Sequence, residues 1–222
     1  MQYDELYDFP TLLGLLDSYE VYGLSGITEN DRAAFVSKLL PVAKKVGQQF
    51  NINPLVIVSQ AAIESAWGTS YMAKNIFNFF GVTAYGKPNQ YWTGEKYVSK
   101  TSGLPFRKYK DAEAGFSDFA RLISSKYKTS ASVSNNVDSY AKSIAYSPYI
   151  SEKNGDNREN YRKGIVDNAK KILALSTNLP AQVVQTVKNL SPETKQAATG
   201  GLVVIGITGL LFFALSSNSK NK

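Results

Sequence analysis

The sequence predicts a mainly α-helical domain that carries a small β-lobe and is followed by a C-terminal transmembrane helix. Three observations support this fold class. Apolar residues recur at three- and four-residue spacing in several segments, which is typical of amphipathic helices. This period is absent between residues 75 and 107, where Gly, Asn, Thr and aromatic residues are frequent. No charged residue lies between Lys195 and Lys220, and a run of that length can cross a bilayer as a helix.

The composition excludes several kinds of catalytic chemistry. The 222 residues contain no Cys and no His. This rules out disulfides, thiol nucleophiles, Ser–His catalysis and the usual Cys- or His-ligated zinc sites. Proton transfer in this chain would therefore depend on Asp, Glu, Tyr or Lys. We expect no metal and no cofactor.

The charge is distributed unevenly along the chain. The formal net charge is +7, and residues 1–31 contain acids but no Lys or Arg, so all 25 basic residues follow them. A basic body suits an anionic polymer or surface, such as cell wall, nucleic acid or lipid headgroups. Because the sequence has no basic helix and no aromatic–basic motif, we do not expect nucleic-acid binding.

Residues 1–30 form an acidic N-terminal segment whose role is left open. They do not resemble an export signal, because the chain begins with Asp4 and Glu5 and no basic stretch precedes an apolar run. The next segment, residues 31–177, has the apolar periodicity and length of one domain.

Two helices open this domain. Thr28 and Asp31 form a capping-box pattern before a helix over about 31–50. A second helix begins at Pro54, a residue that favours the first helical position, and is expected to run to about Trp67.

The rest of the domain contains short strands and further helices. Strands are expected near residues 97–98 and 106–107, on either side of a Ser-Gly turn. Asp111 is the expected cap of the next helix. Further helices are expected at 136–145 and over the apolar stripe at 161–172.

The C-terminal part divides into a linker, a membrane helix and a tail. Residues 178–198 contain two prolines and many polar residues, which indicates a linker with a weak helix at Val183 to Leu190. Residues 199–217 would span about 30 Å as a helix, the thickness of the hydrocarbon core of a bilayer. A buried core helix is the alternative. Residues 218–222 form a short polar tail. Lysines flank the apolar run on both sides, so its orientation in a membrane is left open.

Glu64 is the leading candidate for a catalytic residue. It is a single carboxylate on an otherwise apolar helix, where a charged group is disfavoured unless it has a use. In a low-dielectric cleft the pKa of this carboxyl group would rise, which makes it a plausible proton donor near neutral pH. The alternative is a helix-end acid that reaches water or pairs with a nearby Lys.

Glu95 is the candidate for a second catalytic carboxylate. It lies between Gly94 and Lys96 in a polar segment, where it should stay ionised; the alternative is a solvated turn acid. Glycosidic cleavage uses one protonated carboxyl beside the leaving oxygen and a second group that activates water or stabilises the transition state. Glu64 and Glu95, in unlike environments, would meet that need.

Several fragments occur in order along the chain, at 62–68 (Ala-Ile-Glu-Ser-Ala-Trp-Gly), 73–82, 93–95, 106–109 and 146–149. This ordered set resembles the family-73 glycoside hydrolases, bacterial β-N-acetylglucosaminidases that cut peptidoglycan, over about residues 31–175. The resemblance implies a lysozyme-like helical fold with a cleft between a helical lobe and a small β-lobe. It also implies that Glu64 is the general acid and that Glu95 is the second carboxylate.

Substrate contacts are expected at Tyr146, Tyr149, Trp92, Asn78 and Phe80. By the resemblance, Tyr149 or Tyr146 contacts the N-acetyl group or the intermediate. Asn78 and Phe80 belong to one of the matching fragments, and Trp92 lies in a loop, where it could stack on a sugar ring. The alternative for these aromatic residues is packing in the core.

Two other charged residues are interpreted as structural. We expect Arg107 to bond to the backbone near the cleft. We interpret Asp118 as a first-turn acid that interacts favourably with the dipole of its helix.

These observations predict a membrane-anchored endo-β-N-acetylglucosaminidase that cleaves β-1,4 bonds of peptidoglycan by an inverting, retaining or substrate-assisted route. A lytic transglycosylase is one alternative, although Asn-Phe-Phe-Gly-Val stands where those enzymes carry a Gly-Leu-Met-Gln type motif. A non-catalytic membrane protein with a wall-binding module is another. Because an export signal is absent and residues 199–217 would anchor the chain in a lipid bilayer, we expect a phage protein. Its setting would be a virion membrane or the inner membrane of the host cell.

Overall fold

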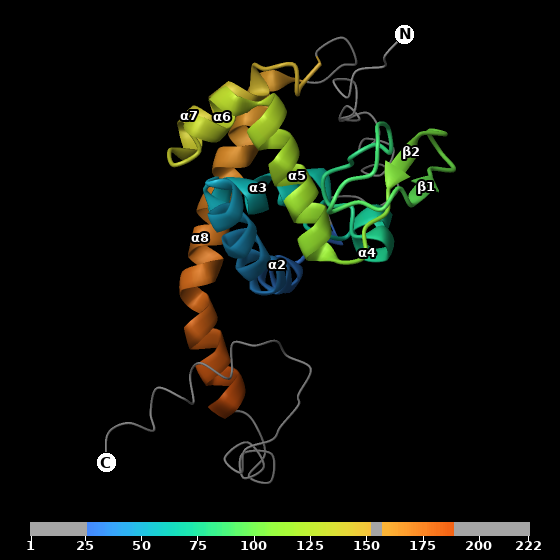
Figure 1. The fold of residues 1–222 in the computed structure, drawn as a ribbon. Helices are drawn as coiled ribbons and strands as arrows, with labels where there is room; N and C mark the ends of the chain where they lie inside the picture. Colours follow the sequence, from blue (N-terminus) through green and yellow to red (C-terminus); the bar gives the residue numbers. More distant parts are fainter. Residues whose placement is uncertain (1–25, 152–156, 189–222) are drawn as a thin grey trace. The chain divides into compact units, whose positions relative to one another are not determined.

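A computed structural model describes residues 26–151 and 157–188, with side chains up to Thr177. The elements are, in chain order, α2 (Glu29–Phe50), α3 (Pro54–Glu64), α4 (Tyr71–Ile76), β1 (Lys96–Val98), β2 (Pro105–Arg107), α5 (Ala112–Lys126), α6 (Lys128–Ser132), α7 (Val137–Ala145) and α8 (Arg158–Lys188) (Figure 1). The described part is mainly helical with one two-stranded sheet, as predicted. Contacts divide the chain after Leu173, and the site described below lies in the part before that division.

Local capping groups set the starts of the long helices. The Thr28 hydroxyl accepts a hydrogen bond from the Asp31 amide at 3.2 Å, and the Asp31 carboxylate accepts one from the Thr28 amide at 2.9 Å. This reciprocal capping box begins α2 as predicted. Asn53 caps α3 by accepting from the Leu55 amide at 2.9 Å, and Asp111 caps α5.

Three features of the helical part differ from the prediction. The short helices α4 and α6 are absent from it, because so few residues carry too little periodicity to be recognised. α3 ends at Glu64 instead of near Trp67. α8 continues to Lys188, into the segment expected as a linker, and contains Pro180. A proline inside a helix removes a backbone donor and costs stability, which is why the sequence indicates a break there.

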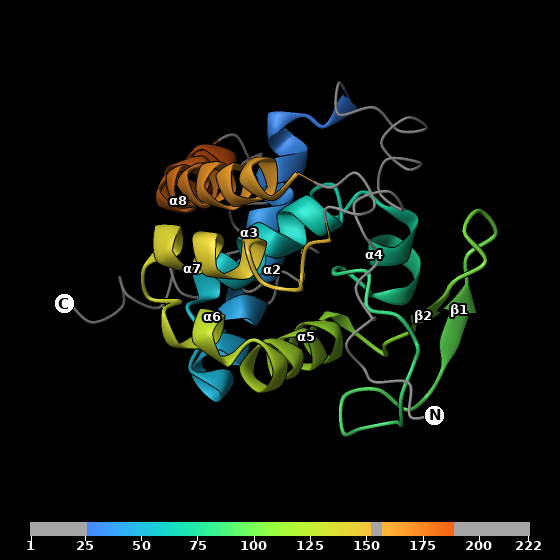
Figure 2. The ribbon, with the colours of Figure 1, turned by 90° about the horizontal axis from the view of Figure 1, so that it is seen from above.

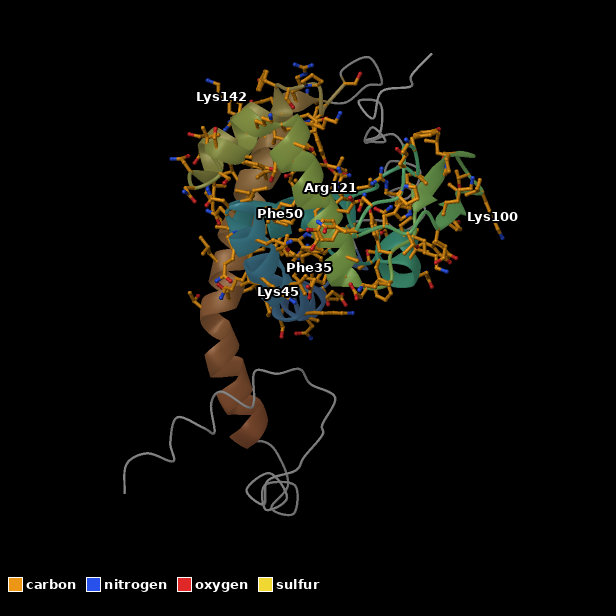
Figure 3. The ribbon with its side chains drawn as sticks, in the orientation of Figure 1. Phe35, Lys45, Phe50, Lys100, Arg121 and Lys142 are labelled. Carbon is orange, nitrogen blue, oxygen red and sulfur yellow. The ribbon has the colours of Figure 1, made fainter. Side chains whose placement is uncertain are left out.

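The β-lobe lies at one side of the described domain, next to α4 (Figure 2). β1 and β2 pair antiparallel with Tyr97 opposite Phe106, which confirms the predicted hairpin. α5 begins beside this lobe and leads to α6, while α7 lies on the other side of the domain (Figure 2). α5 therefore connects the helical part to the β-lobe. Lys100, in the turn between the strands, points away from the helices (Figure 3).

A buried ion-pair cluster ties the β-lobe to α5. Arg107 is fully buried; its Nη1 donates to Asp118 Oδ2 at 2.7 Å. Its Nε and Nη2 donate to the carbonyl oxygens of Thr83 and Tyr85 at 3.0 and 2.8 Å, so Arg107 bonds to backbone as predicted. The interpretation of Asp118 as a first-turn acid is wrong, because it lies beyond the first turn of α5. Its buried carboxylate also accepts from Arg121 Nε at 2.8 Å. This ion pair joins β2 to α5. The residues next to Asp118 in the sequence do not reveal it.

The expected membrane segment, residues 199–217, lies outside the described residues, as do most of the acidic N-terminal segment and the polar tail. Within residues 26–151 and 157–188, no helix combines the length and the hydropathy that crossing a bilayer requires.

Candidate active site

α3 ends at Glu64 because a left-handed turn follows almost directly. Ala66, Trp67 and Gly68 have φ values of 49°, 55° and 75°, which are incompatible with a continuing right-handed helix. The Ser65 hydroxyl holds the turn, because it donates to the Ala61 carbonyl at 2.5 Å and accepts from the Gly68 amide at 2.8 Å. The turn therefore leaves Glu64 at the last position of an apolar helix.

The turn is anchored on α2. The Trp67 ring packs edge-to-face on Phe35 with centroids 5.5 Å apart, and the Arg32 guanidinium lies 5.7 Å from the centre of the Trp67 ring. A Cβ atom at Gly68 would lie 3.0 Å from Phe35 Cδ2. The Ser, Trp and Gly that follow Glu64 thus hold the backbone that places the carboxylate.

Two tyrosine hydroxyls donate to the Glu64 carboxylate. Tyr161 of α8 donates to Oε1 at 2.6 Å, and Tyr149, in the segment after α7, donates to the same oxygen at 3.3 Å. Glu64 is 7% exposed, and both tyrosines are buried. The tertiary structure therefore surrounds this acid with side chains that follow it by 85 and 97 positions in the sequence.

Both tyrosines act as proton-bearing donors. Burial, and next the negative charge of Glu64, raise the pKa of the Tyr149 phenol well above its usual range, and the same two causes raise that of Tyr161. Each phenol therefore keeps its proton at neutral pH. A phenol donor is neutral, so it can stabilise the Glu64 carboxylate without forming an ion pair.

Of these two tyrosines, the sequence analysis predicts Tyr149 and misses Tyr161. Tyr161 belongs to the apolar stripe of α8 and is indistinguishable there from a packing residue. One signal was available: a phenol on a buried helix face needs a hydrogen-bond partner, whereas an aliphatic side chain does not. The partner itself, 97 positions away, could be found only in the folded chain.

Glu95 lies just before β1 in an environment unlike that of Glu64. Its carboxylate pairs with Lys108 Nζ, and 59% of its side chain is exposed. Its backbone carbonyl accepts from Trp92 Nε1 at 2.6 Å and from the Lys108 amide at 2.9 Å. The structure therefore has the buried and exposed pair of carboxylates that the sequence predicts. Among the described residues, no group of three or more acidic side chains is arranged to hold a metal ion.

Three of the expected substrate-contacting residues belong to the scaffold instead. Trp92 is 3% exposed, and the Arg107 guanidinium lies 4.3 Å from the centre of its ring. Asn78 donates to the carbonyl oxygens of Val82 and Arg107 at 2.8 and 2.9 Å. Phe80 is buried and stacks on a phenylalanine of α5 at 3.7 Å. Trp92 packs with Tyr109 and with Ala114 of α5, so the ring that was expected to face a sugar is covered.

The Tyr146 hydroxyl bonds to a residue outside the Glu64 cluster. It is 53% exposed, and its hydroxyl donates to Glu159 Oε2 at 3.4 Å. It lines a surface pocket of about 430 Å³ together with Asp138, Ser139, Lys142, Glu159 and Arg162. Of the two tyrosines that the family resemblance left open, the structure therefore brings Tyr149 to the candidate acid.

Known proteins with similar sequences are named as enzymes that cleave glycans. Residues 40–178 match the Glucosaminidase family, described as mannosyl-glycoprotein endo-beta-N-acetylglucosaminidase. The peptidoglycan hydrolase FlgJ of Vibrio parahaemolyticus is 23% identical over 137 residues, which is 54% of this chain and 42% of that protein. A Lactococcus lactis protein named "Probable N-acetylmuramidase" is 32% identical over 99 residues, 42% of this chain and 23% of the relative. The chain thus spans less than half the length of these relatives.

The fold is also shared with a solved hydrolase domain. The glycoside hydrolase domain of Salmonella typhimurium FlgJ has a TM-score of 0.54 at 18% identity, covering 72% of this chain and 99% of that domain. This likeness confirms the expected fold of the helical domain and its small sheet. The family match covers more than half of the chain, and the chain therefore belongs to the glucosaminidase family of glycoside hydrolases.

Proposed function

We propose that this chain hydrolyses β-1,4 glycosidic bonds in the glycan strands of peptidoglycan, with Glu64 as the general acid. The observation that carries this proposal is the burial of Glu64 at the end of α3, where the hydroxyls of Tyr149 and Tyr161 hold one carboxylate oxygen. The family supplies the reaction class. The FlgJ relative is named a peptidoglycan hydrolase, which supports peptidoglycan as the substrate.

The chemistry needs two groups with different protonation. A protonated Glu64 gives its proton to the glycosidic oxygen while the bond from that oxygen to the anomeric carbon breaks. The leaving sugar departs as an alcohol, and Glu64 becomes a carboxylate that the two phenols stabilise. A second group then assists the attack of water on the anomeric carbon and takes a proton from it.

We propose Glu95 as this second group. It lies on the β-lobe, is half-exposed and forms an ion pair with Lys108. An exposed carboxylate of this kind can approach a water molecule and accept its proton. The anomer that is released first, measured by proton NMR, distinguishes a single displacement from a double one.

We further propose that the bond cleaved is the one on the reducing side of N-acetylglucosamine. The description of the matched family supports this side, whereas the name of the Lactococcus relative would fit the other. Cleavage followed by borohydride reduction is expected to yield glucosaminitol. Muramitol would instead indicate an N-acetylmuramidase.

The central test is dye release from labelled peptidoglycan sacculi by the purified chain. Glu64→Gln is expected to reduce the rate by about a thousandfold, because general acid catalysis typically contributes that much. Glu95→Gln is expected to reduce it by about a hundredfold. The matched control is Glu113→Gln, which removes another exposed Glu–Lys pair, that with Lys45, and is expected to keep full activity.

Other outcomes of the same assay would overturn the proposal. Equal rates for the wild type and Glu64→Gln would remove Glu64 from the mechanism. Products with 1,6-anhydro-muramic ends would identify a lytic transglycosylase. Binding to sacculi without any release by the wild type would identify a non-catalytic wall-binding module.

We also propose that residues 199–217 anchor the enzyme in a membrane. The uncharged sequence between Lys195 and Lys220 supports this, since about 20 apolar or small residues can span a bilayer as a helix. The full chain is expected to stay in the membrane pellet after a carbonate wash, and a chain that ends at residue 198 is expected to be released. Equal release of both would refute the anchor. A setting in a phage virion stays a prediction, which detection of the chain in purified particles would test.

A further inference from the structure

A line of buried side chains connects α7 to the carboxylate at the end of α3. The Tyr140 hydroxyl donates to Gln60 Oε1, and Gln60 Nε2 donates to the Tyr161 hydroxyl oxygen at 3.0 Å. Tyr161 in turn donates to Glu64 Oε1 at 2.6 Å. Gln60 and Tyr140 are fully buried. We call these four residues the Gln60 relay.

The carboxamide gives this relay a direction. The oxygen of Gln60 can only accept a hydrogen bond, and its nitrogen can only donate one. The nitrogen occupies a lone pair of the Tyr161 oxygen, so the phenol proton is directed to Glu64. Burial raises the pKa of the Tyr140 phenol above its usual range, so this residue remains a donor that holds the other end of the amide.

Most residues around Gln60 on α3 are apolar. Val56, Ile57, Val58, Ala61 and Ala62 are all buried, and the buried hydroxyl of Ser59 donates to the Leu55 carbonyl of its own helix at 2.6 Å. A buried amide destabilises a fold unless its groups are hydrogen-bonded, so a leucine would fill this position with less risk to stability. The two bonds of Gln60 therefore require an explanation beyond packing.

We propose that Gln60 is a positioning residue, which orients the proton of Tyr161 toward Glu64 and thereby sets the pH range over which Glu64 gives up its own proton. This inference rests on the proposed role of Glu64. Among the described residues, Tyr161 from α8 and Tyr149 from the segment after α7 are titratable groups that hydrogen-bond to Glu64. A hydrogen bond donated to a carboxylate favours its ionised form, and neighbouring bonds in a line strengthen one another.

The test follows the titration of Glu64 directly. Glutamate carboxyl carbons are labelled with ¹³C, and the Glu64 resonance is identified by its absence in Glu64→Gln. Tyr161→Phe is expected to raise the midpoint of this titration by about one pH unit, because it removes a hydrogen bond to a charged group. Gln60→Leu is expected to raise it by about half as much, since the phenol remains but loses its fixed direction.

The double variant separates a relay from two independent effects. If Gln60 acts through Tyr161, Gln60→Leu combined with Tyr161→Phe has the same midpoint as Tyr161→Phe alone. The matched control is Tyr109→Phe, which removes a buried phenol–carboxylate bond of 2.9 Å at Asp118 and is expected to leave the Glu64 midpoint unchanged. Gln60→Met serves if Gln60→Leu does not fold. The alkaline limb of hydrolysis of soluble glycan chains is expected to move with the midpoint.

The proposal is overturned if Gln60→Leu and Gln60→Met leave the midpoint unchanged, or if their shift persists in full beside Tyr161→Phe. Because the NMR midpoint needs no substrate, its failure is distinguishable from failure of the proposed function. If the midpoints shift as expected but the chain releases no sugar, the proposed hydrolase activity is refuted and the role of Gln60 is supported. If the variants are active but their midpoints do not shift, the hydrolase activity is supported and the role of Gln60 is refuted.

Discussion

The end of α3 and the middle of α5 both bury a carboxylate that accepts from a phenol, but the one on α5 also pairs with two guanidinium groups. Asp118 of α5 accepts from Arg107 and Arg121, at 2.7 and 2.8 Å, and from the Tyr109 hydroxyl at 2.9 Å. Glu64 accepts from the phenols of Tyr149 and Tyr161. One site is an ion-pair cluster that joins two parts of the fold, and the other is a carboxyl group held by hydroxyls.

The difference shows how a fold separates structural acids from reactive ones. If Asp118 lost its charge, the fully buried Arg107 would lose its charged partner, and an uncompensated buried charge is strongly destabilising. A phenol is neutral, so protonation of Glu64 leaves no charge uncompensated on Tyr149 or Tyr161. The first arrangement suits a scaffold, and the second suits an acid that must gain and lose a proton.

The largest expected stability effect follows from the ion-pair cluster. Asp118→Asn is expected to lower the free energy of unfolding by about 3–5 kcal/mol, because Arg107 would stay buried without its charged partner. Glu64→Gln is expected to change it by less than about 1 kcal/mol. Urea denaturation followed by circular dichroism measures both values. Similar losses in the two variants would remove the distinction between the two acids.

Alkaline pH should destabilise both sites alike. Burial, followed by a carboxylate, raises the pKa of the phenols of Tyr109 and Tyr161 well above their usual range. Above about pH 10 the unfolded chain loses these protons while the folded chain keeps them, so stability falls as pH rises, by about 1.4 kcal/mol per pH unit for each phenol. Tyr109→Phe and Tyr161→Phe are each expected to reduce the measured slope by that amount. An unchanged slope in either variant would show that its phenol titrates normally in the folded state.

A smaller effect than that of Asp118→Asn is expected at the turn that follows Glu64. Gly68 has a φ of +75°, and an added Cβ would lie 3.0 Å from Phe35 Cδ2. Gly68→Ala should therefore cost about 2 kcal/mol from backbone strain and crowding together. Gly103→Ala is the matched control, since Gly103 has a φ of +70° but nothing within 4 Å of the added Cβ. It should cost about 1 kcal/mol. Equal midpoints of thermal unfolding would show that Phe35 gives way easily.

The smallest stability effect is expected on the β-lobe. The pair of Lys108 with Glu95 is exposed, so Lys108→Gln should change the free energy of unfolding by less than about 1 kcal/mol. Lys45→Gln, which removes the exposed pair with Glu113, should do the same. Activity should separate the two variants, because Lys108 holds the proposed second catalytic group. Equal hydrolysis rates would indicate that Glu95 works without Lys108, or not at all.

Much of the helical scaffold could be predicted from the sequence because its signals are local. The capping box of Thr28 and Asp31, the Asn-Pro start of α3 and the Asp111 cap each involve residues at most three positions apart. The position of Glu64 on an apolar helix also follows from local pattern. The short helices α4 and α6 could not be found in this way, because neither is long enough to establish a period.

The sequence by itself determined where α2, α3 and α5 begin, that Glu64 is the candidate acid and that Glu95 lies in a polar segment. These properties depend on neighbours along the chain. Only the tertiary structure decided that Tyr161 and Tyr149 donate to Glu64 and that Trp92 is buried in the core. Such roles depend on contacts across 85 or more positions or on the packing of a loop that has no period of its own. An aromatic residue has the same sequence signature in a core and in a site, and only the folded chain supplies the partner that distinguishes them.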